Sequence, residues 1–572
     1  MDNTHNNSRA HYKWRAHIKA LYSSLSPERV LMFWGLLSLS LILLFSALVV
    51  VNNRFLISKP GYGGEVREGI IGTPRFINPI FSTTDQDKDL TSLVFAGLTK
   101  KDAAGNIILD MAQSINKSDD GLSYDVLIKD KATFHDGVAV TADDIIYTVG
   151  LIQNPALKSP LSIKWEGITI EKKGDKEVVF NLKKPYPLFM DVLSVGILPK
   201  HIWKNLTDEQ ISLSDYNIHA IGSGPYKIKS VTSISGIPDT FTLIAHEGYT
   251  LGRPYIDTIT IATFQSEKYL LQAFQNRKID RIHNIAVDKI DSLNINPSNI
   301  HTSLLPRTFS VFFNPNKTTI LSDKNVRAAL QMAIDKQALV DKVLHKYGKV
   351  INGPFPFDDN QIESVYDVEQ AKSLLEKSAP SSNGSTTLSI TLTTANTDEM
   401  KSVAEMIKAD WAKIGVDTNI QVYEVADLNQ SIIKERNFEV LLFGFITEDP
   451  GDLYAFWHSS QRNYPGLNIS NYVSKNLDAN LEIVRSSDDA SARQIAYEEI
   501  KKEFAEEVPG IFLFAPSLTY ITNDNIRGQI PIYSLDSSAR FLLAESWYKY
   551  TDRIWPKTYY KDVIEKIENI IH

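Results

Sequence analysis

The chain carries one hydrophobic run that differs in kind from the rest of its pattern. From Val30 to Val51, 22 consecutive residues carry no charge. That length matches the ~20 residues a helix needs to cross a bilayer and exceeds the ~7 to 15 of a cleavable signal's apolar region. Ser26 can cap such a helix, and Pro27 suits its first turn. The pattern predicts a transmembrane helix over 30–51.

Charges on either side of this run predict its orientation. Five Lys/Arg and two acidic residues precede it, so the positive-inside rule makes residues 1–29 a cytoplasmic tail. The segment 52–63, with Pro60 and nearby glycines, is expected to be a tether to an extracytoplasmic body. The alternative is a signal peptide with a long apolar core that is cleaved. No small-x-small cleavage pattern follows the run, which favours a signal anchor.

Beyond the tether, helix-like and strand-like patterns alternate without a fixed repeat. Residues 142–152 and 324–344 place apolar side chains at helical spacing, whereas 388–394 and 438–445 are short and rich in β-forming residues. Residues 379–386 have the composition of a loop. This alternation predicts α/β layers, and the length predicts more than one lobe.

Composition narrows the classes of function. The 572 residues include no cysteine, which excludes disulfides, thiolate metal sites and a cysteine nucleophile. Residues 1–54 carry a net charge of +4 while the whole chain carries −8, so the remainder carries −12. An acidic body argues against a nucleic-acid partner.

A search for catalytic signatures returns little. The chain has no G-x-S-x-G, P-loop, H-E-x-x-H or complete G-x-G-x-x-G. His135 and Asp136 could in principle form part of a general base, but a turn at Gly137 explains them better, and Thr141 followed by Asp144 fits a helix N-cap. We therefore expect no enzyme activity, no cofactor and no metal site.

One stretch, 444–461, gathers acidic and aromatic residues. Glu448, Asp449 and Asp452 lie within five positions, and Tyr454 and Trp457 follow them. Such a loop could serve a catalytic, metal or ligand-binding site. A hydrolase using these carboxylates is disfavoured, because glycoside hydrolases place their two acids on opposite sides of the substrate. For each residue taken singly, a structural role is an equal alternative, with Asp449 capping a turn and Trp457 in the core.

Several segments, in order, carry a resemblance to a known family. These are "GTPRFINPIF" (72–81), "LVFAGLTKKDAAGNI" (93–107), "FHDGVAVTADDIIYTV" (134–149), "IGSGPYKI" (221–228), "GRPYIDTITI" (252–261), "AFQNRKID" (273–280), the stretch 314–356, and the closing "WHSSQ", "NYVSKNLDANL" and "EEVPGIFLF". Together they resemble the family 5 extracellular solute-binding proteins, the peptide-, nickel- and oligosaccharide-binding components of ABC importers. Arg277 stands where that family usually has a glycine.

The resemblance implies an α/β fold of the periplasmic-binding-protein-like II class, with two lobes, a hinge and an extra subdomain in the first lobe. Mapped onto this chain, lobe I would comprise 64–98, 220–305 and 510–555. The extra subdomain would comprise 99–219 and lobe II 306–509. Residues 556–572 are predicted to form an amphipathic C-terminal helix that the family pattern does not cover.

The resemblance also implies a ligand site between the lobes. One wall would be the loop after the Asn-Pro turn, with Thr83, Thr84 and Asp85. The other would be the stretch 444–461, with ligand contacts from Phe445, Glu448, Asp449, Asp452, Tyr454 and Trp457. Peptide-binding relatives hold the ligand's ammonium group with an aspartate four residues before a proline. Here Pro450 is that proline and Ile446 occupies the aspartate's position, so either Glu448 substitutes or the ligand has no amine there.

The implied function is capture of a small solute, expected to be an oligopeptide, by a monomer that delivers it to ABC permease subunits in the membrane. A membrane-anchored sensor of the same fold without a transport role is the main alternative. Nickel binding is a variant within the family, for which His458 is one candidate ligand without metal spacing around it. Which solute is bound stays open.

Overall fold

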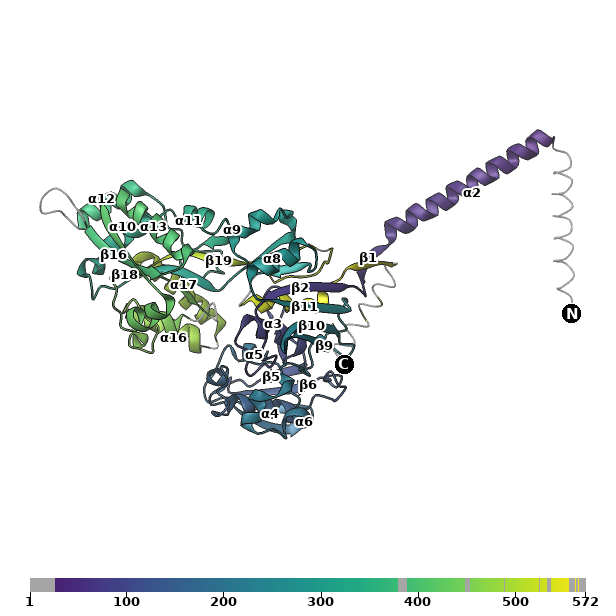
Figure 1. Ribbon diagram of the computed structural model, residues 1–572, viewed down its shortest axis with the longest axis horizontal. Coiled ribbons are helices and arrows are strands. Elements are labelled where there is room, and N and C mark those ends of the chain that lie inside the picture. The colour runs from purple at the N-terminus through teal and green to yellow at the C-terminus, as the bar shows by residue number, and fades with distance from the viewer. Residues whose placement is uncertain are drawn as a thin grey trace. The chain divides into compact units, whose positions relative to one another are not determined.

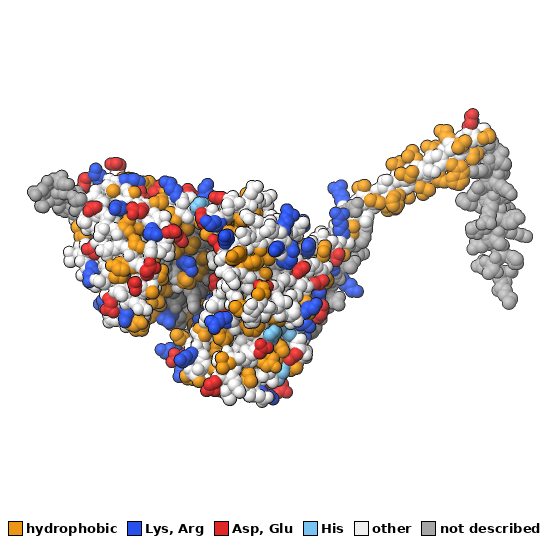
Figure 2. Space-filling model, viewed as in Figure 1, with side chains coloured by type: hydrophobic (Ala, Val, Ile, Leu, Met, Phe, Trp, Pro, Cys, Tyr) orange, Lys and Arg blue, Asp and Glu red, His pale blue; other side chains and the backbone are white. Residues whose placement is uncertain are grey.

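The computed structural model describes residues 26–378, 388–447, 453–487, 489–523, 525–531 and 536–554, together with 561 and 564. The chain divides into two compact units, one of residues 1–61 with 551–571 and one of residues 62–550. In the smaller unit, helix α2 (Pro27–Phe55) contains a candidate membrane span at Pro27–Val50 with a mean hydropathy of 2.4. Ser26 occupies the N-cap position without a side-chain hydrogen bond, and Pro27 takes the first turn as expected. Figure 2 shows its almost uniformly hydrophobic surface.

The predicted tether has more structure than expected. Helix α2 continues through residues 52–55, and β1 (Ile57–Gly61) begins two residues later and forms a two-stranded sheet with β20 (Tyr550–Ile554). Pro60 is compatible with this strand because each strand of a two-stranded sheet has a free edge, where a missing N–H is tolerated. The predicted C-terminal helix, 556–572, lies outside the described residues except for Lys561 and Ile564, which are helical.

A twelve-stranded mixed sheet runs through the larger unit (Figure 1). Its path runs β17 (Val416–Tyr423), β16 (Leu388–Ala395), β18 (Val440–Ile446), β14 (Arg307–Phe313), β19 (Gly510–Thr522), β12 (Arg281–His283), β2 (Glu65–Ile71), β11 (Thr258–Phe264), β10 (Ile237–Ala245) and β9 (Tyr226–Ile234), with β13 (Ile300–Leu304) and β15 (Gly348–Val350) also paired to β19. The predicted strands 388–394 and 438–445 correspond to β16 and β18.

Strand β19 belongs to both lobes. Its first half pairs with β14 and β15, and its second half pairs with β12 and β13. The chain passes a second time between the lobes where β13 continues into β14, and Leu305 N–H donates to the Pro516 carbonyl at 3.1 Å at this point. Two adjacent strand segments therefore join the lobes, as the expected hinge requires.

Each lobe has its own hydrophobic cluster. The first extends from Val66 to Ile261 and adds Tyr520, Phe541, Ala544 and Trp547 from the end of the chain. The second extends from Val311 to Ala515. A smaller cluster surrounds α8 (Glu267–Gln275) and β12. The separate cores support the two-lobed architecture, because each lobe buries its apolar side chains independently of the other.

The region of the expected subdomain forms a four-stranded antiparallel sheet beside α4 (Ala142–Gln153). Its strands, in order, are β5 (Ala112–Lys117), β6 (Ser123–Ile128), β8 (Glu177–Asn181) and β7 (Thr169–Gly174). Thr141 and Asp144 form the predicted cap of α4, with Thr141 N–H donating to Asp144 Oδ2 at 2.8 Å. Gly137 adopts a φ of 88°, which confirms the predicted turn.

The helical pattern at 324–344 forms two helices rather than one. Helix α10 (Lys324–Met332) ends before Asp335, whose side chain caps α11 (Lys336–Lys342) by accepting from Ala338 N–H at 2.9 Å. Asp335 N–H in turn donates to Asp410 Oδ2 at 3.1 Å. The apolar periodicity continues through the break, so periodicity alone does not reveal it. The predicted loop 379–386 lies outside the described residues.

Candidate functional site

The first predicted wall is the segment that leads into helix α3 (Asp85–Val94). Thr84 is the N-cap of this helix, and its hydroxyl accepts from Asp87 N–H at 3.2 Å. The carboxylate of Asp87 accepts from the N–H groups of Arg75 and Phe76 at 2.6 and 2.8 Å, which fixes the preceding loop against the helix. Thr83 and Thr84 are exposed and Asp85 is half-buried. The three predicted residues therefore lie together on an accessible, well-ordered turn.

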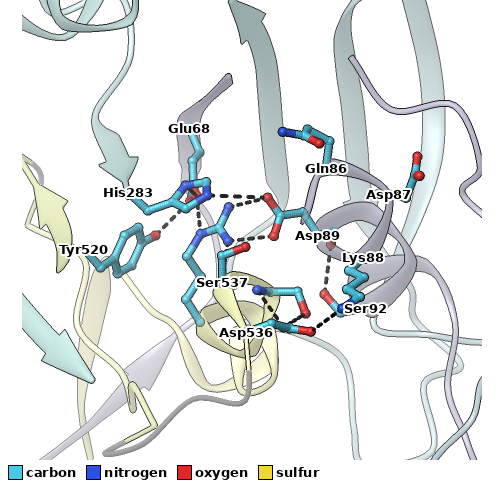
Figure 3. Close-up of polar contacts among 12 residues, drawn as sticks. Glu68, Gln86, Asp87, Lys88, Asp89, Ser92, His283, Tyr520, Asp536 and Ser537 are labelled. Atoms are coloured by element: carbon cyan, nitrogen blue, oxygen red, sulfur yellow. Dashed lines mark hydrogen bonds and ion pairs between the residues drawn. The ribbon is translucent and has the colours of Figure 1, made fainter. Parts of the chain in front are cut away.

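A buried charge network, Glu68, Asp89, His283 and Arg540, holds α3 in place (Figure 3). Arg540 donates to both carboxylate oxygens of Asp89 at 2.7 Å and to Glu68 at 2.6 Å. Tyr520, from the strand shared by the lobes, donates to Glu68 at 2.8 Å. The network thus joins the helix of the first wall, strand β2, the shared strand and the C-terminal segment 536–547.

Charge pairing outweighs the cost of burial at Glu68 but not at Asp89, where burial raises the pKa of the carboxyl despite the neighbouring Arg540 guanidinium. Burial disfavours the charged form of Glu68, but Arg540 and His283 lower the pKa of its carboxyl to about 2. His283 lies between the two acids, with Nδ1 3.6 Å from Glu68 and Nε2 3.8 Å from Asp89. Glu68, Asp89 and Arg540 are each at most 2% exposed. We therefore assign the network a positioning role beneath the first wall.

The second predicted wall lies where the parallel strands β16, β17 and β18 end. Ligands of open α/β sheets bind outside the carboxyl ends of such strands. Ile446, at the end of β18, is 49% exposed and pairs across the sheet with Arg307, the exposed first residue of β14. Thr397 caps helix α13 (Asp398–Lys413) just after β16, accepting from Met400 N–H at 3.2 Å. These ends form a polar rim around Ile446.

Arg307 and Glu399 are two charged residues on this rim that were not predicted. Glu399 is exposed, yet desolvation by the surrounding protein raises the pKa of its carboxyl group, and Arg307 opposes that rise. The sequence signal for Arg307 is a lone charge at the start of an otherwise uncharged strand, directly after the crossing between lobes.

The predicted residues of the stretch 444–461 divide into three groups. Glu448, Asp449 and Asp452 lie outside the described residues. Phe445 and Trp457 are 6% and 1% exposed, and both ring systems pack on Phe312, with centroid separations of 6.0 and 5.9 Å. Trp457 therefore lies in the core of lobe II, which is the alternative that the sequence left open.

Tyr454 is half-buried and packs within lobe II. Its ring stacks on His458 at 4.1 Å, and the Arg485 guanidinium lies 4.5 Å from its centroid. His458 Nδ1 lies 2.8 Å from Ser460 Oγ, and its Nε2 lies 3.4 Å from Glu482. Among the residues that the structure describes, no group of three or more His, Cys, Asp or Glu is arranged to hold a metal ion.

A cavity of about 530 Å³ lies in the first lobe rather than between the lobes. It is lined by Thr73, Pro74, Arg75, Asp215, Ile218, His219, Val231, Ser233, Gly236, Ile237 and Pro238. None of these residues belongs to lobe II, so the cavity is separate from the space between the predicted walls. In Figure 2 a hollow separates the two lobes.

Comparison with known proteins identifies the family. Residues 106–465 match the family model of the bacterial extracellular solute-binding proteins, family 5 (middle). The oligopeptide-binding protein AppA of Bacillus subtilis is 30% identical over 491 residues, covering 82% of this chain and 89% of AppA. The solved structure of AppA in complex with a nonapeptide has a TM-score of 0.61 at 29% identity, covering 86% of this chain and 99% of AppA.

Two further solved structures share the fold. NikZ from Campylobacter jejuni in complex with Ni(L-His) has a TM-score of 0.64 at 27% identity, covering 85% of this chain and 99% of NikZ. The ABC transporter substrate binding protein CtaP from Listeria monocytogenes has a TM-score of 0.72 at 26% identity, covering 86% of this chain and 99% of CtaP. The expected two-lobed fold is thereby confirmed, and the chain belongs to the bacterial extracellular solute-binding proteins of family 5.

Proposed function

We propose that this protein captures a peptide-like solute between its two lobes and delivers it to an ABC permease. The observation that carries the proposal is the 30% identity to an oligopeptide-binding protein over 82% of the chain. The family consists of solute-binding proteins rather than enzymes, and we propose that this chain likewise catalyses no reaction. Two crossing strand segments and two separate cores would allow the lobes to close on the solute, because rigid lobes can rotate about a short hinge.

In this mechanism, closure brings the α3 turn of lobe I toward the polar rim of lobe II. Ligand atoms then exchange water for protein contacts in a less polar environment, which strengthens each charged interaction. A micromolar dissociation constant would correspond to about −8 kcal/mol. Arg307 and Glu399 supply one charge of each sign on the rim, whereas Ile446 supplies none. We propose that Arg307 binds a carboxylate of the peptide and that Glu399 faces its ammonium group. Glu448, Asp449 and Asp452 remain candidate contacts from the adjacent loop.

A binding experiment on the full chain in detergent tests this assignment. Peptides that co-purify with the chain are identified by mass spectrometry, and the tightest is resynthesised with a free and with an amidated C-terminus. We expect amidation to weaken binding about tenfold or more, since an unpaired buried charge costs more than 1.4 kcal/mol. In Arg307→Gln the two peptides should bind alike.

Arg253→Gln is the matched control, because Arg253 is a surface arginine of lobe I paired with Glu247 and Asp257. This variant should keep the preference for the free carboxylate. Equal binding of both peptides by the unaltered chain would refute the role of Arg307. Retention of Ni(L-His) or a sugar instead of any peptide would refute the peptide assignment itself.

We further propose that α2 anchors the protein in a membrane, with residues 1–29 cytoplasmic and the lobes outside the cytoplasm. The length and hydropathy of the span and the basic residues before it support this arrangement. Protease protection of the intact cell-bound chain, with and without membrane permeabilisation, tests it. Deleting the permease and finding uptake of the bound peptide unchanged would favour the anchored sensor over the importer.

A further inference from the structure

The cavity of lobe I lies beyond the carboxyl ends of two parallel strands. Strands β2 and β11 pair in parallel as far as Ile71 and Phe264, and the chain reaches the cavity wall at Thr73. Pro238, on another wall, accepts a hydrogen bond from Thr263 Oγ1 at 3.3 Å through its carbonyl. In open α/β sheets, ligands bind outside the carboxyl ends of the strands. The cavity therefore has the position in the sheet that ligand sites commonly have.

Buried side chains hold two of the cavity walls in place. Asn78 Nδ2 donates to Asn217 Oδ1 at 2.9 Å, and the Asn217 carbonyl accepts from Ile77 N–H at 2.7 Å. Both asparagines are at most 2% exposed. These bonds join the loop that contains residues 73–75 to the segment 215–219, which includes the short helix η2 (Asp215–Asn217). The two walls are therefore fixed to each other before any ligand binds, as is usual for small-molecule sites.

The third wall is the tip of the β9–β10 hairpin. Ser235 and Gly236 form its turn with φ values of 52° and 81°, and two positive angles are what the favoured two-residue hairpin turn requires. Strand β11 pairs with β10 only at residues 240–244, so the tip extends past the neighbouring strand. Ile234 and Ile237 on the tip are 65% and 59% exposed. Ile237 lines the cavity, so part of this wall is an apolar side chain that the protein leaves largely uncovered.

The cavity combines apolar walls with one available cation. Ile218 and Val231 line it and also pack against the core of lobe I. Arg75 is the only lysine or arginine among the described lining residues, and within the described part of the chain its guanidinium has no ion-pair or hydrogen-bond partner. Asp215 is already engaged, since its Oδ2 lies 2.8 Å from His219 Nδ1. An arginine in this state can bind a carboxylate through two parallel N–H bonds.

We propose that this cavity is a second ligand site, which binds an amphipathic monocarboxylate. Arg75 binds the carboxylate, and Ile218, Val231 and Ile237 contact the aliphatic or aromatic body of the ligand. The cavity volume of about 530 Å³ lies within the ~300 to 1,000 Å³ that is usual for small-molecule sites. A second negative charge on the ligand is disfavoured, because Asp215 would repel it and no second lysine or arginine is among the described lining residues.

Binding at this site does not depend on closure of the two lobes. All of the lining residues belong to lobe I, so a ligand held there does not bridge the hinge. A solute bound between the lobes favours the closed protein, whereas a ligand in this cavity has the same contacts in the open and the closed protein. The inference therefore stands apart from the proposed capture of a peptide.

Fluorine NMR of the full chain in detergent tests the proposal, with fluorophenylacetate and fluorophenylacetamide as probes. Micelles without protein set the baseline, and line broadening against protein concentration gives the dissociation constant. We expect the acid to bind with a dissociation constant on the order of 1 mM or tighter. The amide should bind about tenfold more weakly, because it cannot form the charged pair. Arg75→Gln should weaken binding of the acid about tenfold and leave binding of the amide unchanged.

Two further variants control for charge and for place. Arg253→Gln, at a surface arginine paired with Glu247 and Asp257, should bind the acid as the unaltered chain does. Ser233 is an exposed residue of the cavity wall, so Ser233→Trp should fill the cavity without disturbing the core and should abolish binding of both probes.

Three results would overturn the proposal. They are no binding above the micelle baseline, equal binding of the acid and the amide by the unaltered chain, and loss of the acid in Arg307→Gln with retention in Arg75→Gln. The last result would place the probe between the lobes. The preference of the bound peptide for a free C-terminus, measured separately, should be unchanged in Arg75→Gln, so failure of this site and failure of the peptide assignment are distinguishable.

Discussion

The two predicted walls rest on supports of opposite chemistry. Beneath the α3 turn of lobe I, buried carboxylates converge on Arg540, which donates charged hydrogen bonds to both Glu68 and Asp89. Beneath the rim of lobe II, Trp457 packs on Phe312, Phe504 and Phe512, with Phe504 at right angles to it. The stability of a buried charge network depends on every charged member being present. The stability of an aromatic core depends instead on how completely the side chains fill its volume. The two lobes should therefore respond differently to substitution and to pH.

The largest expected loss of stability comes from a substitution in lobe I. Arg540→Met leaves Glu68 and Asp89 buried without their cation, and removing one partner of a buried network costs about 5 kcal/mol of unfolding free energy, the upper end of the usual range. Urea titration of the full chain in detergent measures it. Arg253→Met, which breaks the surface pairs to Glu247 and Asp257, should cost about 1 kcal/mol or less. Equal losses in the two variants would contradict the network's role.

In lobe II, Trp457→Ala should cost about 4 kcal/mol, because a large aromatic side chain leaves a cavity. Trp457→Phe retains most of the volume and should cost less than half as much. Native-state hydrogen exchange locates the change, which we expect in β14, β18 and β19 and not in β2. If the hydrogen-exchange protection of β2 weakened to the same extent, the two lobes would not be stabilised independently of each other.

Acid should destabilise lobe I first. Burial, with a further contribution from His246, lowers the pKa of His135 to about 3, so the native ring stays neutral while the unfolded one gains a proton below about 6.5. The unfolded state then binds more protons, and stability falls as pH falls. Between pH 6.5 and 4.5 the loss is about 2 to 3 kcal/mol at 1.36 kcal/mol per pH unit.

His135→Asn is the matched variant for that pH dependence. Its side-chain oxygen can still accept from Gly222 N–H, which donates to His135 Nδ1 at 3.3 Å, but it does not titrate. We expect a flatter pH dependence between 6.5 and 4.5, measured by urea titration at each pH. An unchanged slope would assign the acid sensitivity to other groups.

The smallest expected loss of stability comes from substitutions at Thr84, which distinguish a structural role of this residue from a ligand contact. Thr84→Ala removes the cap of α3 and should cost about 1 kcal/mol, whereas Thr84→Ser keeps the hydroxyl. If peptide affinity falls in Thr84→Ala and is unchanged in Thr84→Ser, the capping hydroxyl is sufficient to explain the role of Thr84. Weaker binding by Thr84→Ser at unchanged stability would instead require a ligand contact through the methyl group.

Short-range patterns were predictable, and contacts distant in sequence were not. The cap at Thr141 and the turn at Gly137 follow from local residue chemistry, and β16 and β18 follow from β-forming composition. Arg540 lies 472 positions from Glu68, and nothing local to either residue identifies its partner. Trp457 could not be assigned to core or cleft for the same reason, since its neighbours in space come from β14, α17 (Ala490–Glu507) and β19.

The sharing of β19 between the lobes has a consequence for the order in which the chain can be assembled. Residues 510–522 lie centrally in the sheet of both lobes, and the core of lobe I also needs Phe541 and Trp547. Neither lobe can complete its sheet while the chain is still being synthesised up to residue 510. Roughly nine-tenths of the polypeptide must therefore wait for its last tenth, and during that time its apolar strands are open to chaperones.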